Sequence, residues 1–394
     1  MTPEEIQKFR DYTRGCSSVA HFNNAGAALM PDSVYMAVAG HLAREREIGG
    51  YEAYAENATA FGAFYDHVAK LINARKDEIA FVENATRAWD MAFYSIPFRE
   101  GDVIITAQAE YVSNYLAFLQ VARRKGVAIR VVPDDVHGQI DLDALEGMID
   151  GRTKLIAITH VPTQGGLINP AEAVGKIARR HGVLYLLDAC QSVGQMPVDV
   201  ERIGCDMLSA TGRKFLRGPR GTGFLYVRSS ILDTLDPIFT DLHAAEWTGD
   251  NSFALSAGAQ RFENWECYYA GKLGLSEASR LASSIGLDRI EARVQMLAGL
   301  LRRELSAIDG VEVCDLGQFK SGIVTFQKRG LDPEAIKEHL SKASINVSVT
   351  RASSSRLDLP KRGLAALVRA SVHYYNTQEE IAKLCAEVRA AGRN

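Results

Sequence analysis

The fold is decided by residues 154–191, where two short apolar runs flank an amphipathic segment. The first run is Lys154-Leu-Ile-Ala-Ile-Thr-His160, and the second is Val183-Leu-Tyr-Leu-Leu187. The segment between them, Pro170 to His181, has the apolar spacing of a helix. A strand, a helix and another strand in this order predict a parallel pair. Both faces of that pair are expected to be buried, because the runs are apolar throughout.

Similar apolar runs recur on both sides of this unit, and helical stretches separate most of them. The runs lie at 79–82, 102–106, 128–132 and 223–227. One of the intervening helical stretches is Tyr115 to Lys125. Together they predict an α/β fold with a mainly parallel sheet over roughly residues 60–230.

A different pattern follows residue 265. A long helical stretch runs from Tyr269 to Ile308, broken near Gly286, and shorter strand and helix signals follow it up to a closing helix from Thr377. This pattern predicts a smaller α+β domain at the C-terminal end. We expect a large domain over residues 16–260 and a small one over 261–394, with residues 1–15 packing against the small domain.

Net charge, apolar run lengths and cysteine spacing argue against a nucleic-acid-binding, membrane-spanning or metal-binding protein. The 394 residues carry a formal net charge of −3, whereas a nucleic-acid partner would favour a basic stripe. No apolar run approaches the roughly 18 residues that span a bilayer. The N-terminus is charged from residue 4, and the six cysteines are scattered without a metal-binding spacing. We therefore expect a cytoplasmic protein with reduced thiols and no metal, nucleic-acid or membrane partner.

A carboxylate and an amine stand out as candidate catalytic groups. Asp188 ends an apolar strand, at the edge of the sheet where ligands bind in open α/β folds. Lys214 follows in a glycine-rich stretch. A lysine can hold an aldehyde as a Schiff base, and a carboxylate can keep a pyridine nitrogen protonated, so that the ring accepts electrons. The pair predicts a pyridoxal 5'-phosphate site, against the alternatives of a turn aspartate and a surface lysine.

Several neighbouring residues suit the rest of such a cofactor. Asn84 follows a predicted strand and is expected to cap a helix, whose first amides, at Ala85 and Thr86, would form an anion site. The hydroxyl of Thr211 and the guanidinium of Arg213 are further phosphate ligands. Gln191 can donate to the phenolate oxygen of the cofactor. An ordinary capped helix and a capping amide are the alternatives for the helix start and for Gln191.

Motifs spread over most of the chain carry a family resemblance. They are His21-Phe-Asn-Asn-Ala-Gly-Ala27, Asn84-Ala-Thr86, Thr159-His-Val161, Asp188-Ala-Cys-Gln191, Thr211-Gly-Arg-Lys214 and Val368-Arg-Ala-Ser-Val-His-Tyr-Tyr-Asn-Thr377. From about His21 to Glu380 the chain resembles the class V aminotransferase and cysteine desulfurase group of fold-type I pyridoxal-phosphate enzymes. The resemblance implies a seven-stranded large-domain sheet, an amino-acid substrate and a homodimer whose active site forms at the interface. It also implies an interface role for Trp265.

The resemblance further implies roles for single residues. Tyr111 falls where the desulfurases place a histidine that stacks on the cofactor ring, so it keeps a stacking surface without imidazole acid–base chemistry. Thr163 falls where the family often has an asparagine near the cofactor and the substrate carboxylate. Arg369 matches the arginine that grips this carboxylate, and Asn24 is implied at the substrate. Arg213 replaces a common phosphate-binding histidine.

The motifs predict the cofactor more sharply than they predict which reaction the amino-acid substrate undergoes. Desulfurases of this family carry a persulfide-forming cysteine shortly before the carboxylate arginine, and residues 348–367 contain none. Cys190 is interpreted as a small packed residue. We therefore favour a lyase that eliminates a β-substituent by cleaving a C–S bond, without a protein persulfide. A class V aminotransferase is the alternative and an amino-acid racemase or epimerase the third, with a non-enzyme ligand-binding relative as a further reading.

Overall fold

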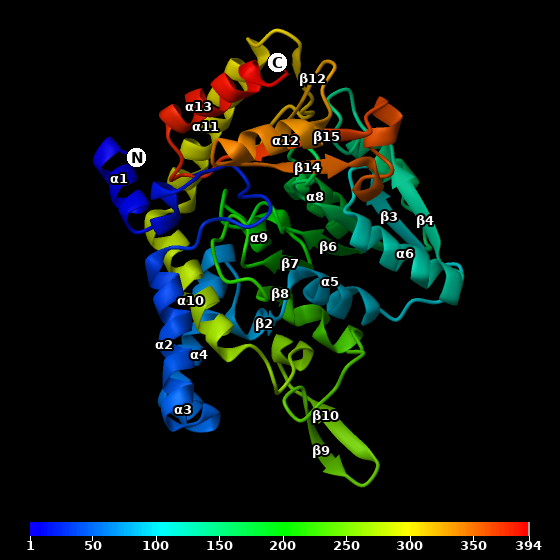
Figure 1. Ribbon diagram of the computed structural model, residues 1–394. Helices are drawn as coiled ribbons and strands as arrows, with labels where there is room; N and C mark the ends of the chain where they lie inside the picture. The colour runs from blue at the N-terminus through cyan, green and yellow to red at the C-terminus, as the bar shows by residue number, and fades with distance from the viewer. Residues whose placement is uncertain (393–394) are drawn as a thin grey trace.

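The computed structural model describes residues 1–392, so residues 393–394 of the predicted small domain lie outside it. A seven-stranded sheet in the order β2-β8-β7-β6-β5-β3-β4 forms its centre (Figure 1). The four neighbouring pairs from β7 to β4 are parallel, whereas β8 is antiparallel to both of its neighbours. This arrangement confirms the α/β class and the mainly parallel sheet. In sheet order the strands are β2 (Ile79–Val82), β8 (Gly223–Val227), β7 (Met207–Thr211), β6 (Leu184–Asp188), β5 (Thr153–Thr159), β3 (Val103–Ala107) and β4 (Ala128–Val132).

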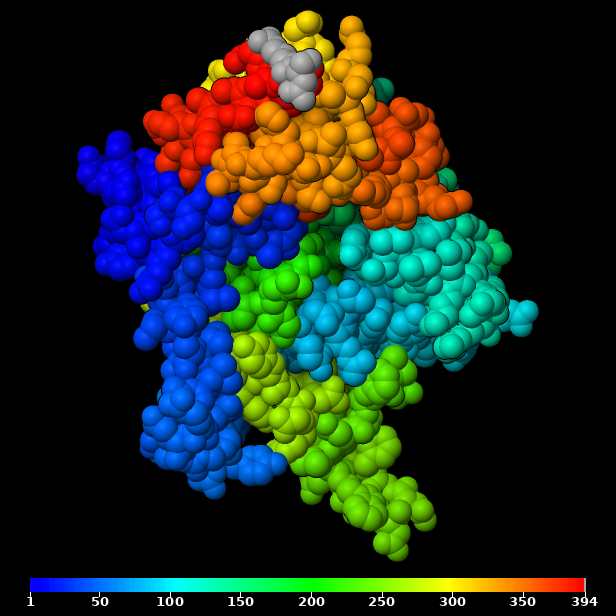
Figure 2. Space-filling view, in the orientation of Figure 1, coloured from blue at the N-terminus to red at the C-terminus, as the bar shows by residue number. Residues whose placement is uncertain are grey.

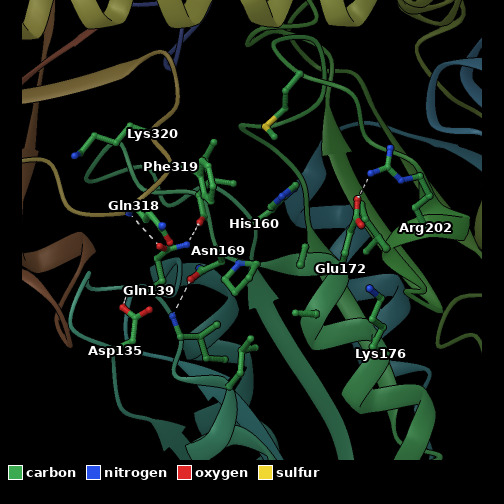
Figure 3. A pocket seen from close by; sticks show the side chains of 18 of the residues that line it. Asp135, Gln139, His160, Asn169, Glu172, Lys176, Arg202, Gln318, Phe319 and Lys320 are labelled. Atoms are coloured by element: carbon green, nitrogen blue, oxygen red, sulfur yellow. Dashed lines mark hydrogen bonds and ion pairs between the residues drawn. The ribbon is translucent and has the colours of Figure 1, made fainter.

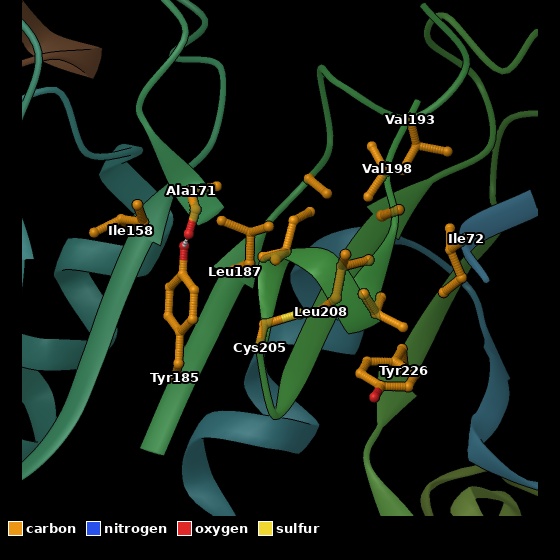
Figure 4. Packing of buried hydrophobic residues seen from close by; sticks show 14 of the residues in the cluster. Ile72, Ile158, Ala171, Tyr185, Leu187, Val193, Val198, Cys205, Leu208 and Tyr226 are labelled. Atoms are coloured by element: carbon orange, nitrogen blue, oxygen red, sulfur yellow. Dashed lines mark hydrogen bonds between the residues drawn. The ribbon is translucent and has the colours of Figure 1, made fainter. Parts of the chain in front are cut away.

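Helices cover both faces of this sheet. On one face, α5 (Ala85–Tyr94) and α6 (Val112–Lys125) bury aromatic and aliphatic side chains against the strands. On the other, α4 (Ala58–Ile72) and α8 (Ala171–His181) complete the larger core cluster, part of which appears in Figure 4. Successive strand residues alternate between the two clusters, which explains why the strand sequences are apolar throughout. The shorter helices α7 (Leu142–Met148) and α9 (Val200–Ile203) lie in the crossover connections.

Two parts of the large domain have no counterpart in the sequence predictions. Helices α2 (Asp32–Ile48) and α3 (Gly50–Glu56) lead into α4, and α2 and α4 both pack against α10 (Tyr269–Ile285). The antiparallel strands β9 (Ala245–Gly249) and β10 (Ser252–Leu255) form a hairpin that projects from the body of the molecule (Figures 1 and 2).

A second, antiparallel sheet lies near the C-terminal end of the chain. Its order is β11-β12-β15-β14, and α11, α12 and α13 share its core cluster. Helix α10, which the predicted boundary at residue 261 assigns to the small domain, contributes Leu275 and Ala278 to the core of the large one. We propose that the boundary lies near Gly286, between α10 and α11. The elements are β11 (Val311–Val313), β12 (Ile323–Lys328), β14 (Ser348–Arg351), β15 (Ala366–Ser371), α11 (Leu287–Ser306), α12 (Pro333–Lys342) and α13 (Gln378–Ala390).

The N-terminal segment lies against the small domain. Helix α1 (Pro3–Asp11) is tied to it by the Arg10–Glu380 ion pair at 2.8 Å. Strand β1 (Ala20–His21) pairs in parallel with β13 (Ile345–Asn346). Within residues 1–392 no helix is long and apolar enough to cross a membrane. The 3₁₀ helices are η1 (Arg14–Ser17), η2 (Lys76–Glu78), η3 (Ser229–Thr234), η4 (Ala259–Phe262), η5 (Ala352–Ser354) and η6 (Leu359–Arg362).

Candidate active site

A cavity of about 350 Å³ lies at the edge of the sheet where β5, β6 and β7 end. All residues predicted to bind the cofactor line it. Its lining consists of Asn84, Ala85, Thr86, Tyr111, Thr159, Val161, Thr163, Asp188, Cys190, Gln191, Thr211, Arg213 and Lys214. The convergence follows from the topology, because parallel strands direct the loops after their carboxyl ends to one edge.

Asp188 is the last residue of β6, and Lys214 follows the neighbouring parallel strand β7. The carboxylate of Asp188 is buried and accepts hydrogen bonds from Asn114 Nδ2 at 3.0 Å and from the Cys190 N–H at 2.9 Å. Burial lowers the pKa of Lys214, whereas the nearby Cys190 and Asp188 act in the opposite direction. A depressed lysine pKa favours the neutral amine, which is the nucleophilic form.

The start of α5 forms the anion-binding end of the cavity. Asn84 caps the helix, with its side chain accepting from the Arg87 N–H at 2.9 Å. The amides of Ala85 and Thr86 belong to the first turn, whose N–H groups have no intrahelical acceptor. A Cβ added to Gly223 would lie 2.9 Å from Asn84 C and 3.1 Å from Ala85 N. The glycine therefore lets the helix start approach the sheet closely, which creates a cradle for a phosphate group.

Arg213 and Lys214 line this cavity, and Arg369 lies beside it in contact with the lining residue Thr163. None of Arg213, Lys214 and Arg369 forms an ion pair with any residue in the described part of the chain. Burial, with the neighbouring charge of Arg213, lowers the pKa of Arg369 to about 10. Half-buried cations without an ionic partner are costly, so this arrangement suits two anionic groups. A phosphate ester and an amino-acid carboxylate would satisfy it, and the side chains present therefore fit pyridoxal phosphate and its substrate.

Arg369 comes from the small domain and is held in a fixed orientation. Its Nε donates to Ser348 Oγ at 3.0 Å, and its Nη1 donates to the backbone carbonyl of Thr163 at 3.1 Å and to the Thr163 hydroxyl. Gln191 Nε2 donates to the same hydroxyl at 3.0 Å, while Gln191 Oε1 is buried and has no hydrogen-bond partner among the described residues. The two predicted carboxylate contacts thus lie side by side: Thr163 lines the cavity, and Arg369 lies against Thr163.

Comparison with known proteins decides the family. The model of the aminotransferase class-V family matches residues 20–384. The chain belongs to this family. It is accordingly a pyridoxal-phosphate-dependent enzyme with the fold-type I architecture.

Individual proteins are similar to this chain over most of its length. A "probable cysteine desulfurase" of Methanothermobacter thermautotrophicus is 33% identical over 322 residues, which is 80% of each chain. The apo structure of a cysteine desulfurase from Thermococcus onnurineus NA1 superposes with a TM-score of 0.91 at 28% identity, covering 99% of this chain and 98% of that one. The cystine C–S lyase C-DES, in complex with its reaction product cysteine persulfide, has a TM-score of 0.87 over 96% of this chain and 100% of that one. At 22% identity, this last similarity shows the fold alone.

Asn24, a predicted substrate residue of this class-V enzyme, lies away from the cavity and contacts none of its lining residues through its amide. The amide of Asn24 is fully buried, donates to the Ser371 carbonyl at 2.7 Å and accepts from the Tyr375 hydroxyl. Because these contacts occupy the amide, we propose that Asn24 joins the N-terminal motif to the small domain rather than contacting substrate.

Sequence reasoning missed several residues at the cavity. Thr159 and Val161 line it, and so does Cys190, for which the sequence alone predicts only a packing role. Glu110 and Asn114 lie directly behind Asp188 and form hydrogen bonds with the lining residues. In the sequence, Glu110 and Asn114 are separated by four positions just before the helix predicted from Tyr115, and this spacing is the local sign that they could lie together. It was too common a spacing to identify them.

A larger cavity, of about 1110 Å³, lies elsewhere and contains neither Lys214 nor Asp188 (Figure 3). His160, Gln139 and Asn169 are among its lining residues. Burial lowers the pKa of His160 to about 4, so this imidazole is neutral near neutral pH. Within residues 1–392 no group of three or more His, Cys, Asp and Glu side chains is arranged to hold a metal ion.

Proposed function

We propose that this class-V enzyme is a lyase that cleaves the Cβ–S bond of a cysteine-type amino acid without forming a persulfide on the protein. The names of its relatives support cysteine as the substrate class and sulfur removal as the reaction. The contacts of the cavity support an amino acid held by its carboxylate at Arg369.

The placement of the thiols carries the proposal. The segment that joins β14 to β15, residues 352–365, contains serines but no cysteine. Cys190 is the cysteine that lines the cavity, and burial together with Asp188 raises the pKa of its thiol well above its ordinary value. A thiol that stays protonated is a poor nucleophile toward sulfur. The sulfur is therefore expected to leave on a small molecule.

Most of the lining residues have a proposed task. Pyridoxal phosphate, when bound, supplies an electron sink for the electrons left at Cα. The N-terminus of α5, with Thr211 and Arg213, would hold the phosphate. Asp188 would hold a proton at the pyridine nitrogen, and Lys214 would move the proton at the substrate Cα.

The remaining contacts concern the ring face and the substrate. The side chain of Tyr111 would cover one face of the ring, and Gln191 would donate to its phenolate oxygen. Arg369 and Thr163 would fix the substrate carboxylate, so that the Cα–H bond is presented in one orientation. In the net reaction the Cα–H and Cβ–S bonds break, and the sulfur leaves with the bonding electrons and takes up a proton. Water then completes the conversion to a keto acid and ammonia.

The deciding experiment follows product release in the absence of an amino acceptor. Purified holoenzyme is mixed with cysteine, cystine or S-substituted cysteines, and keto acid and ammonia are measured together. Many turnovers that release both products in equal amounts would support the lyase. A single stoichiometric conversion that requires an added keto acid to continue would instead establish the aminotransferase that the family name suggests. A change in optical rotation alone would establish a racemase or epimerase.

We further propose that the enzyme is a homodimer. Aromatic side chains are exposed around a cavity of about 820 Å³ that Trp265 helps to line. The hairpin adds Trp247, 78% exposed, and Phe253, 62% exposed. Exposed aromatic surface of this extent is typical of protein interfaces. Light scattering should give twice the chain mass, and Trp265→Glu should shift the enzyme toward the monomer; a monomeric wild-type enzyme would contradict the proposal.

A further inference from the structure

A buried glutamate lies directly behind the proposed cofactor site. Glu110 occupies the loop between β3 and α6 and is 5% exposed. Its Oε1 accepts hydrogen bonds from the Tyr111 N–H at 2.8 Å, from Asn114 Nδ2 at 2.9 Å and from the Thr159 hydroxyl. Its Oε2 accepts from Thr106 Oγ1 at 3.1 Å. Four donors from three segments therefore converge on one carboxyl group.

Asn114 links this carboxyl group to the proposed catalytic carboxylate. Its Nδ2 donates to Glu110 Oε1 at 2.9 Å and to Asp188 Oδ2 at 3.0 Å. One amide nitrogen thus spans two carboxyl oxygens, one on the β3–α6 loop and one at the end of β6. All three side chains are buried, so water does not compete for these bonds.

We propose that Glu110 is a positioning residue. It fixes the positions of Tyr111, the proposed group at the face of the cofactor ring, and of Asp188, the proposed group at the ring nitrogen. It holds the backbone of Tyr111 directly, and it holds Asp188 through Asn114. The contacts that fix the two groups meet at a single atom, Glu110 Oε1. Their relative placement consequently depends on this oxygen rather than on the two loops independently.

The pattern of contacts indicates that geometry, rather than negative charge, is what Glu110 contributes. Within the described chain it has no cationic partner, and Asp188 is the neighbouring charge that acts on it. A glutamine would retain the three bonds at Oε1, and its amide could donate to the Thr106 hydroxyl, which is able to accept. Leucine has a similar volume and retains none of the four bonds. Comparing the Gln and Leu variants therefore distinguishes the effect of the hydrogen bonds, which only Gln retains, from the effect of side-chain volume, which both retain.

The test uses cofactor labelled with ¹⁵N at the pyridine nitrogen, bound to the protein without substrate. Its ¹⁵N chemical shift reports whether that nitrogen is protonated, and a binding titration of the cofactor-free protein gives the affinity. Glu110→Gln is expected to keep the wild-type shift and affinity. Glu110→Leu is expected to move the shift toward the unprotonated value and to weaken cofactor binding about tenfold or more. Asn114→Leu should reproduce the ¹⁵N effect if Glu110→Leu does not fold.

Two controls make the outcome decisive. Thr106→Val removes the contact at Oε2 alone and should leave the ¹⁵N signal unmoved even if the protein is less stable. Asp188→Asn supplies the signal expected when the carboxylate is lost. The inference rests on the proposed role of Asp188 but not on the reaction branch. If Asp188→Asn moves the signal and both leucine variants do not, only the positioning role is overturned; if Asp188→Asn leaves it unmoved, the site assignment fails with it.

Discussion

Arg369 Nη1 lies 3.1 Å from the backbone carbonyl of Thr163, which joins the small domain to the cofactor loop of the large one. This contact fixes the guanidinium beside the lining of the cavity while leaving it without a carboxylate partner among the described residues. Because a half-buried guanidinium without an ionic partner is costly, the geometry is best explained by an anionic group supplied by the substrate.

The first prediction concerns this guanidinium. Arg369→Lys should raise KM for the amino acid about 10- to 100-fold, because a charge-assisted bidentate pair contributes about 1.5–3 kcal/mol. Steady-state kinetics measure the effect. Arg351→Ala is the matched control, since Arg351 forms an exposed ion pair with Glu334 at 2.7 Å. An unchanged KM in Arg369→Lys would reassign the residue to structure.

A second prediction concerns the amine. Lys214→Ala should abolish borohydride trapping of the cofactor on the protein, and turnover should fall at least about 10³-fold because the Cα proton loses its carrier. Peptide mapping after reduction identifies the trapped residue. Lys176→Ala, at the larger cavity, should behave as wild type. Cofactor still trapped on the Lys214→Ala protein would show that another lysine holds it.

The phosphate cradle gives a third prediction. Gly223→Ala would place a methyl group 2.7 Å from the Ala210 carbonyl oxygen and 2.9 Å from Asn84 C, forcing the start of α5 away from the sheet. The cost should be about 1–3 kcal/mol, expressed as weaker cofactor binding and a lower Tm. Gly147→Ala, whose added Cβ meets nothing within 4 Å, is the control. Unaltered cofactor affinity in Gly223→Ala would argue against the cradle.

Glu110 gives a prediction about pH. Burial, with the charge of Asp188 adding to it, raises the pKa of Glu110 from 4.5 to about 7. The folded protein therefore favours the protonated form. The raised pKa of Glu110 therefore adds to the free energy of unfolding. This added stability is fully present below pH 4.5 and is lost as the pH rises through 7. From pH 5 to pH 8 the wild type should lose on the order of 2–3 kcal/mol relative to Glu110→Gln.

Denaturant unfolding of the cofactor-free proteins at these two pH values measures this difference. Parallel pH dependence in the wild type and in Glu110→Gln would mean that Glu110 is ionised in the fold throughout.

Much of the fold could be predicted because its signals are local. Apolar runs such as Val183–Leu187 are continuous since helices cover both faces of the sheet, and the loops after parallel strands meet at one edge. Strand β7, Met207–Thr211, lacked such a signal because Ser209 and Thr211 interrupt its apolar pattern. The packing of α10 on the large domain depends on contacts with α2 and α4, which are far away in the sequence, and helical periodicity does not reveal such contacts.

The site was predictable where a residue type has a distinctive chemistry, as with Lys214 and Asp188. The roles that escaped prediction depend on hydrogen bonds between distant segments. Asn24 binds Ser371 across the two domains, and Asn114 joins Glu110 to a strand that begins 70 residues later. Neither relationship produces a local pattern in the sequence.

The most direct test of the lyase proposal follows the sulfur atom itself. The holoenzyme is quenched during turnover of cystine, the intact protein is weighed by mass spectrometry, and small-molecule sulfur is quantified alongside the keto acid. The account predicts no added mass, one small-molecule persulfide or thiol for each keto acid, and the same result in Cys190→Ala. Protein that carries one extra sulfur atom, lost in Cys190→Ala together with turnover, would contradict it and make Cys190 the sulfur acceptor.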